Sequence, residues 1–425
     1  MNVKSAIKKS VSSSIFKNLS VLVVGTIIAQ LVVIAFQIVI RRIYSPEDFG
    51  AFAVYMSILG MVATIASLRY EQTIILPKEK VKARALLSLS ILIAFLFSFI
   101  VFLLVILFKT QIVALLGLSE QYGTWLFFIP ISVFLFCSYQ AINFYLIREK
   151  QFTVSASNKV IRRLSEGSVQ SLFGTLGSSF GLFVGDMIGQ GAMICRAVFV
   201  NKKVFKNKIS FHNLTEVALR YKDFPLKNGI PSILNSISLL LPVILINRFF
   251  SEEITGFFDL ARMVLIIPLS LVTASLSQVL LQRFTEKRNN KQSIVKDSLG
   301  IVAFLLLFST SFILIIELFG PKLFEFIFGN EWIESGNYAK ILVWAFGLKF
   351  IISPFNVSFT AFERIGVGSL WQTFYFALII SLIFIPHDNI VQFLRNYLII
   401  EIVAYVFAAI MNVTIIANYE NSLKI

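Results

Sequence analysis

Histidine and cysteine are scarce in this chain, and their scarcity argues against several kinds of chemistry. Each occurs only 2 times among 425 residues. Both His212 and His387 fall in loops, so we expect neither a histidine metal site nor a Ser-His-Asp or Cys-His nucleophile. Cys137 and Cys195 lie inside apolar runs, so we expect no structural disulfide and no cysteine metal site. The sequence therefore predicts no metal and no cofactor.

The sequence also lacks a phosphate-binding loop and a long polar insertion. No segment fits G-x-x-x-x-G-K-[ST], so we do not expect this chain to hydrolyse a nucleotide. The longest connection on the predicted outer side, roughly 320–335, leaves no room for a soluble catalytic domain. We therefore predict that the chain is not an enzyme. A membrane polysaccharide polymerase or glycosyl transferase is the alternative, although it would normally need a larger outer loop.

Hydrophobic residues, in contrast, are abundant. They make up 57% of the chain, Phe alone occurs 44 times, and the mean hydropathy is +0.82. This composition excludes an ordinary soluble domain and indicates an all-α polytopic membrane protein. The lengths of the apolar runs predict twelve membrane-spanning helices. The predicted spans are 19–40, 50–76, 83–108, 122–147, 154–177, 180–200, 224–249, 255–283, 297–319, 336–362, 367–386 and 390–417.

Two of these spans have unusual sequences. The fifth, 154–177, is so polar that a hydropathy window would not identify it as a span. We infer it because the span count must agree with the charges on either side. A helix that polar must be buried among other helices or face water. In the sixth span Gly181, Gly185 and Gly189 lie four residues apart, a pattern that lets two helices approach closely. We favour packing over ligand binding for these glycines.

Basic residues gather in the connections on one side of the predicted membrane. Most of the 38 Lys and Arg residues fall there when the N-terminus is placed inside, which predicts that both termini are cytoplasmic. The same distribution accounts for most of the net charge of +15, so we expect no nucleic-acid partner. The basic loop 201–208 is better explained as a topology determinant that faces anionic membrane lipids.

The longest break in hydrophobicity, 201–221, separates six spans from six. We therefore predict an N-terminal six-helix bundle (1–200), a cytoplasmic linker (201–223) and a C-terminal six-helix bundle (224–425) around a central cavity. A short internal match suggests duplication, and chance in so biased a composition is the alternative. The match pairs Arg42, Ser45, Glu47, Gly50 and Phe52 with Arg248, Ser251, Glu253, Gly256 and Phe258 at a constant offset.

Charged residues inside the spans are the candidate site. Asp259 and Arg262 lie three residues apart, hence on one face of a helix, and that face should line a cavity rather than lipid. Basic side chains suit an anionic cargo, because Arg and Lys bind phosphate or carboxylate oxygens. The candidate substrate-binding residues are Arg69, Arg162, Arg163, Arg262 and Lys349. The candidate coupling or charge-partner acids are Glu71, Glu166, Asp186, Asp259 and Glu401.

Simpler roles for these charges stay open. Arg69 lies near the inner end of the second span, and Arg162 and Arg163 lie in the polar fifth span. All three could be interfacial residues that extend to the cytoplasmic surface. Arg262 and Lys349 lie several turns from a span end, so for them the alternative is a structural ion pair. Asp259 could equally be the partner of a nearby arginine.

Several motifs together resemble the polysaccharide transporters, the O-antigen and capsule repeat-unit flippases of the multidrug/oligosaccharidyl-lipid/polysaccharide exporter superfamily. The resemblance is clearest over 221–286 and covers nearly the whole chain. It is carried by Phe224, Pro225, Pro231, Asn235, Pro242, Gly256, Ala261, Arg262, Ile267, Pro268, Leu269, Ser277 and Gln278, and by Gly25, Thr26, Ala29, Gln30, Arg42, 44–50, 68–71, Leu76, Pro77, Gly181, Leu182, Gly185, Gly189, Gln190, Phe328, Gly329, Trp332 and Gly336.

The resemblance implies a flippase that moves an undecaprenyl-diphosphate-linked oligosaccharide, such as the repeat unit of O-antigen lipopolysaccharide or capsule, across a bacterial inner membrane. It implies a cationic cavity with Arg69, Arg262 and Lys349 as candidates, and a polysaccharide polymerase with chain-length machinery as partners. The seventh span carries no Asp or Glu, so the sequence does not predict a coupling acid there. With twelve spans, the chain is less like the peptidoglycan-precursor flippases. A cation-coupled multidrug antiporter of the same fold is the alternative, and it should have an acidic cavity.

Overall fold

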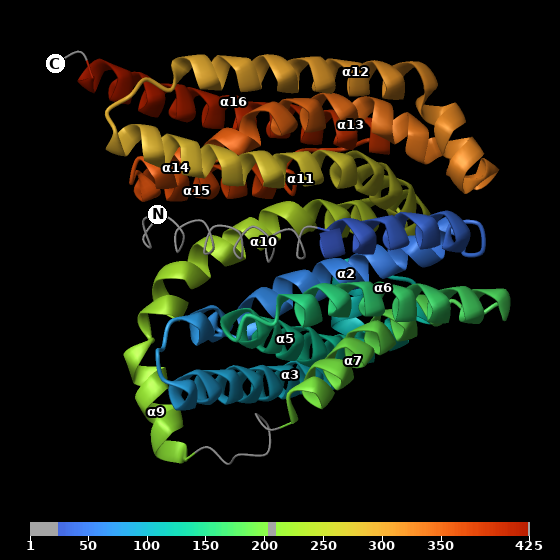
Figure 1. The fold of residues 1–425 in the computed structure, drawn as a ribbon. Helices are drawn as coiled ribbons and strands as arrows, with labels where there is room; N and C mark the ends of the chain where they lie inside the picture. The colour runs from blue at the N-terminus through green and yellow to red at the C-terminus, as the bar shows by residue number, and fades with distance from the viewer. Residues whose placement is uncertain (1–23, 203–209, 424–425) are drawn as a thin grey trace. The chain divides into compact units, whose positions relative to one another are not determined.

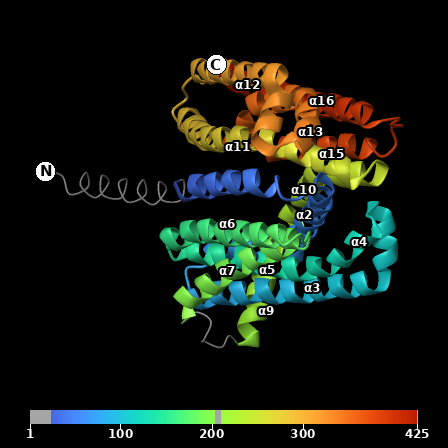
Figure 2. The same cartoon turned by 90° about the vertical axis from the view of Figure 1, so that its right-hand side faces the viewer.

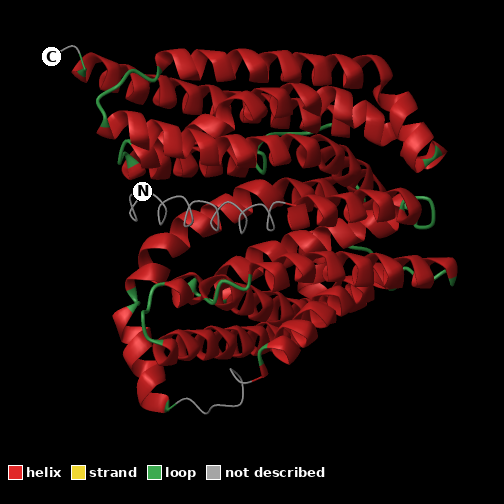
Figure 3. Cartoon of the chain, in the orientation of Figure 1, coloured by secondary structure: helices red, strands yellow, loops and turns green. Residues whose placement is uncertain are grey.

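The computed structural model describes residues 24–202 and 210–423, with the backbone alone at 226–228. These residues form helices and turns without any strand (Figures 1 and 3). The prediction of an all-α polytopic membrane protein is therefore confirmed. The basic N-terminal segment, the start of the first span at 19–23 and most of the basic loop 201–208 lie outside the described residues.

Helices occupy all twelve predicted spans. In the described residues nine helical segments are long and apolar enough to cross a membrane. Two shorter apolar helices, Val24–Ile40 and α15 (Ile365–Ser381), lie at the first and eleventh spans. The polar fifth span is α6 (Phe152–Thr175). The other helices are α2 (Pro46–Ala66), α3 (Lys80–Leu116), α4 (Glu120–Gly123), α5 (Phe128–Arg148), α7 (Gly181–Val200), α9 (Phe211–Arg220), α10 (Asp223–Phe249), α11 (Glu252–Asn289), α12 (Val295–Phe328), α13 (Ile333–Ile352), α14 (Ser358–Ala361) and α16 (Ile390–Ser422), with 3₁₀ turns η1 (Tyr70–Ile75), η2 (Thr124–Phe127), η3 (Asn330–Trp332) and η4 (Ser353–Val357).

The end of the second span was predicted wrongly. We expected it to run to residue 76, but α2 ends at Ala66. Leu68 and Arg69 have φ angles of 50° and 61°, in the left-handed region that a continuing helix cannot use. The chain then proceeds as the 3₁₀ helix η1. Local backbone geometry of this kind leaves no mark on hydropathy.

The helices group into two compact units. One contains the described part of Met1–Ser45 together with Val54–Ile233, and the other contains Pro46–Ala53 and Leu234–Ile425. The chain thus passes from the first unit to the second within α10, and the first two turns of α2 belong to the second unit. Our sequence boundaries, 1–200, 201–223 and 224–425, stay a prediction.

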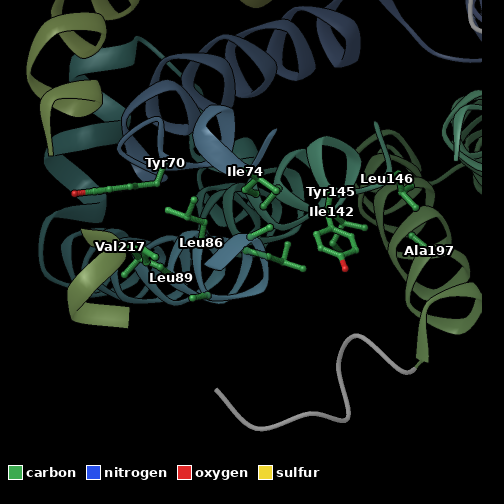
Figure 4. Packing of buried hydrophobic residues seen from close by; sticks show 13 residues of the cluster. Tyr70, Ile74, Leu86, Leu89, Ile142, Tyr145, Leu146, Ala197 and Val217 are labelled. Atoms are coloured by element: carbon green, nitrogen blue, oxygen red, sulfur yellow. The ribbon is translucent and has the colours of Figure 1, made fainter. Parts of the chain in front are cut away.

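The first unit has an apolar core between α3, η1, α5, α7 and α9 (Figure 4). Leu86 of α3, Ile142 of α5 and Ala197 of α7 are almost completely buried in it. Val217 of the short helix α9 completes the cluster, and the hydroxyl of Tyr70 donates to the Ala218 carbonyl at 2.9 Å. Helix α9 is thereby fixed against the start of α3.

Packing of α6 against α7 depends on the glycines of α7. A Cβ on Gly185 would meet Gln170, and one on Gly189 would meet the Arg162 carbonyl at 2.9 Å. Both glycines therefore let the backbone of α7 approach α6 closely, which confirms the packing role predicted from their spacing.

In the second unit α13 is the central helix. It packs against α11, α12 and α16, which run alongside it (Figures 1 and 2). Helix α11 begins at a cap, where the Ser251 hydroxyl accepts from the amide of Ile254 at 3.2 Å. Trp332, completely buried beside the start of α13, packs edge-on against Phe49 and Phe257. The helices that carry Arg262, Lys349 and Glu401 therefore lie next to one another, with α13 between α11 and α16.

Candidate functional site

The strongest candidate site in the second unit is a buried ion pair. Lys349 of α13 and Glu401 of α16 lie with Nζ and Oε2 3.7 Å apart. The side chain of Glu401 is 1% exposed, whereas that of Lys349 is 22% exposed. An unpaired carboxylate at that depth would be strongly destabilising, so Lys349 neutralises Glu401 while keeping one side open.

Aromatic residues surround this pair. The Tyr375 hydroxyl donates to Oε1 of Glu401 at 2.5 Å. Nζ of Lys349 lies 5.1 Å from the ring centroid of Tyr405, within the range of a cation–π interaction. The rings of Trp371 and Tyr375 are stacked, with their centroids 5.6 Å apart. The carboxylate is therefore fixed by the Tyr375 hydroxyl and its ion pair with Lys349, while the ammonium has more freedom.

A small cavity lies on the open side of Lys349. It has a volume of about 80 Å³ and is bounded by α11 and α13. Besides Lys349, its polar lining consists of the side chains of Ser270, Thr273 and Ser353. The ammonium can donate hydrogen bonds into the cavity, whereas Ser270 and Thr273 already donate their hydroxyl hydrogens to the carbonyls of Ile267 and Ser270. With one positive charge and no acidic side chain in its lining, the cavity suits an anionic oxygen better than a cation.

Arg262 adds a second positive charge near this site. Its guanidinium NH1 donates to the Leu239 carbonyl of α10 at 2.9 Å, and its charge acts on both Lys349 and Tyr397. Asp259 is half-buried on the same helix. Since a guanidinium has five N–H donors, the bond to Leu239 leaves several available.

The first unit holds a second charged cluster, formed by α6 and α7. Arg162 lies 3.1 Å from Asp186 and 3.8 Å from Glu166, and Arg163 lies 2.8 Å from Glu166. Gln190 donates to the other Asp186 oxygen at 2.6 Å, and the Asp186 side chain is 0% exposed. Two acids thus balance two arginines. This pairing explains how so polar a helix can lie among apolar ones.

Arg69 and Glu71 form a separate pair in the first unit. Their side chains approach to 3.8 Å at the start of η1, where Arg69 is 24% exposed and Glu71 is 6% exposed. The structure therefore gathers seven of the ten predicted site residues into two clusters and leaves Arg69, Glu71 and Asp259 outside them. The assignment of all ten to substrate binding or ion coupling stays a prediction.

The sequence analysis did not identify the aromatic residues of the site. Tyr397, Glu401 and Tyr405 are spaced four residues apart, as are Trp371 and Tyr375, so each set lies on one face of its helix. That spacing around an intramembrane acid was the available signal. Over the described residues no cluster of three or more His, Cys, Asp or Glu side chains could hold a metal ion.

Comparison with solved structures identifies the fold. The chain is similar to an inward-facing multidrug resistance MATE family transporter of the MOP superfamily (TM-score 0.74, 14% identity, 92% of this chain and 96% of the other). It is equally similar to the lipid II flippase MurJ in an inward closed conformation (TM-score 0.75, 14% identity, 94% and 90%). A third similar structure is a MOP superfamily transporter from Pyrococcus furiosus (TM-score 0.61, 14% identity, 95% and 96%).

Sequence comparison identifies the family. No curated protein matches the chain. A family model described as polysaccharide biosynthesis protein matches residues 39–337, which include α2 to α12 and the beginning of α13. The match covers well over half of the sequence. This chain therefore belongs to the polysaccharide biosynthesis protein family and has the fold of the MOP superfamily transporters.

Proposed function

We propose that this protein is a flippase for an undecaprenyl-diphosphate-linked oligosaccharide, such as an O-antigen or capsule repeat unit. The observation that carries the proposal is the position of Lys349: an ammonium within a membrane-spanning helix borders a cavity lined by three hydroxyl groups. An isolated charge at such depth is costly, and in membrane proteins it usually marks the pathway of a charged ligand. The family match and the similarity to a lipid II flippase support a cargo of this class.

Glu401 and the cargo would compete for Lys349. Without cargo, the buried carboxylate holds the ammonium 3.7 Å away. A diphosphate oxygen in the adjacent cavity would draw Nζ toward the hydroxyl groups and accept a charge-assisted hydrogen bond. Arg262 would hold a second phosphate oxygen through its remaining donors. Arg69, Arg162 and Arg163 are paired with acids, so we assign them weaker, secondary contacts with the head group.

Transport by alternating access would move the sugar and diphosphate through the protein while the lipid tail stays in the bilayer. We place the protein in a bacterial inner membrane with both termini in the cytoplasm, and the cargo moves from the cytoplasmic to the periplasmic leaflet. A polysaccharide polymerase and its chain-length machinery would then use the product. The protein itself makes and breaks no covalent bond of the cargo.

Reconstitution tests this function directly. The full-length protein would be placed in vesicles with a fluorescent, short-chain lipid-diphosphate oligosaccharide, and the fraction of label hidden from an outside quencher would be followed. We expect Lys349→Gln to slow the exchange by about tenfold or more, the loss of roughly one charge-assisted hydrogen bond. Lys340→Gln is the matched control, because Lys340 lies on the same helix and is likewise paired with an acid, Glu317 at 3.8 Å. Equal rates for all three proteins would contradict the proposal.

A cation-coupled multidrug antiporter is the second candidate function. It is favoured by the similarity to a MATE transporter and by the buried acids Glu401 and Asp186. In that case drug efflux from a pump-deficient host should depend on the acids and be abolished by Glu401→Gln. If drug resistance is unchanged by expression of the protein, while oligosaccharide exchange is accelerated, the flippase function stands.

A further inference from the structure

An apolar groove lies on the second unit, on a face of α13 different from that of the Lys349 cavity. It has a volume of about 490 Å³ and runs between α12 and α16. Both helices pack against α13 but make little contact with each other, so the end of α13 forms the floor through Ile351 and Ile352. Val302 and Ala417 lie on the two walls.

The polar groups that line the groove are largely bound to the protein. Asn412 accepts from the Ser358 hydroxyl at 2.6 Å and donates to Asn356 at 2.8 Å. At one end, Oε1 of Glu420 accepts from the amide of Ile294 at 2.7 Å. The groove therefore presents apolar surface to its occupant, and water would gain few hydrogen bonds there.

Membrane location identifies the class of that occupant. Both walls are helices long and apolar enough to span a bilayer, and the groove is lined by the exposed apolar residues Leu299 and Val413, so we expect it to open toward hydrocarbon. At about 30 Å³ for a group the size of a water molecule, the groove of about 490 Å³ holds a chain of about 16 such groups. A single acyl chain has this size, whereas a long polyprenyl chain would overfill the groove.

Charge at the end of the groove identifies the head group. Between residues 283 and 297 there are five basic and two acidic side chains. Asp297 is already paired with Arg283 and Lys287, at 2.8 Å each, and Arg288 with Glu363 at 3.1 Å. Lys291 and Lys296 are exposed and have no ion-pair partner among residues 24–202 and 210–423. Lys296 directly follows the groove residue Val295.

We propose that this groove binds one acyl chain of an anionic glycerophospholipid, with the lipid phosphate held by Lys291 and Lys296. Basic residues at a membrane boundary attract anionic head groups, and the adjacent groove adds a site for the chain. Glu420 opposes the phosphate at the same end, but its Oε1 already accepts a hydrogen bond from the Ile294 amide and so does not face the phosphate freely. The proposal does not depend on transport activity, because the groove is distinct from the cavity beside Lys349.

Native mass spectrometry of the purified full-length protein tests the site. The protein would be equilibrated with equal amounts of phosphatidylglycerol and phosphatidylcholine carrying the same acyl chains. We expect retained phosphatidylglycerol to exceed phosphatidylcholine by about fivefold or more. The surface double variant Lys291→Gln/Lys296→Gln should remove this preference. Equal retention of both lipids by the unmodified protein would overturn the proposal.

A matched pair of substitutions tests the groove itself. Ala417→Trp fills it from α16 and should lower retention of both lipids, whereas Ala303→Trp, exposed on α12 outside the groove, should not. Identical retention in the two variants would contradict the assignment. An added arm contains undecaprenyl phosphate. If that lipid displaces phosphatidylglycerol, and Ala417→Trp blocks its retention, the groove holds a polyprenyl chain and the acyl-chain proposal is wrong.

Discussion

Nζ of Lys349 lies 3.7 Å from Oε2 of Glu401. The Lys349 side chain is 22% exposed, whereas the Glu401 side chain is only 1% exposed. The carboxylate is held in place by the protein, whereas the ammonium can turn toward the cavity beside it. The structural contribution of this pair and its contribution to transport can therefore be separated by experiment.

Removing one or both charges of the pair should have different effects on stability. Lys349→Gln leaves Glu401 buried and unpaired, which should cost about 3–5 kcal/mol of the free energy of unfolding. The double variant Lys349→Gln/Glu401→Gln should recover most of that loss, but not the transport. Thermal unfolding in detergent and vesicle exchange would be measured on the same preparations. Recovery of both properties in the double variant would mean that Lys349 is only a structural partner.

The hydrogen bond from Tyr375 should stabilise the buried carboxylate. Tyr375→Phe removes the donor 2.5 Å from Oε1 of Glu401, and we expect a loss of about 1–3 kcal/mol. Tyr139→Phe is a suitable control, because its hydroxyl makes a longer contact of 3.5 Å to Asn143. Thermal unfolding would be compared for the two variants. A smaller effect at Tyr375 than at Tyr139 would argue against this role.

Two glycines should be essential where α2 crosses α11. A Cβ on Gly50 would overlap the backbone carbonyl of Glu252, and one on Gly256 would overlap that of Pro46. Gly50→Ala or Gly256→Ala should therefore destabilise the protein by about 1–3 kcal/mol, the usual cost of overpacking. Gly300→Ala is the control, since a Cβ added there would have no neighbouring atom within 4 Å. Folded yield and thermal unfolding would report the difference, and equal values would refute the close crossing.

The attachment of α9 should depend on pH. Lys82 donates to Glu216 at 2.8 Å, and this hydrogen bond lowers the pKa of Glu216 below its ordinary value of 4.5. Because the folded-state pKa is depressed, the stabilisation is present above pH 4.5 and is lost as the pH falls through the lowered pKa. Amide exchange in α9 should accelerate over that range. The same acceleration in Glu216→Gln would show that another group is responsible.

Much of the fold could be predicted from the sequence, because a membrane imposes simple rules on composition. Long apolar runs mark helices, and even the polar helix α6 was predicted from the distribution of charges. Its boundaries agree within a few residues, and its arginines are balanced by Glu166 and Asp186. The end of α2 was predicted wrongly because the turn at Leu68 and Arg69 depends on backbone angles rather than on hydropathy.

The candidate site could be predicted only as separate charges. Lys349 and Glu401 were each identified as intramembrane residues, but their pairing depends on how α13 packs against α16. The tyrosines around Glu401 were missed because an aromatic residue is ordinary in a span, and only its spacing from the acid distinguishes it. Packing between distant segments is the information that a single sequence does not provide.

The crossing of α2 and α11 has an evolutionary consequence. Each glycine faces the carbonyl of a residue at the corresponding position of the internal sequence match: Gly50 faces Glu252, and Gly256 faces Pro46. Neither position can accept a larger residue alone, since a bulkier side chain at one would push the two helices apart at the other. In related proteins with this crossing, the residues at the positions of Gly50 and Gly256 should therefore stay small together or change together.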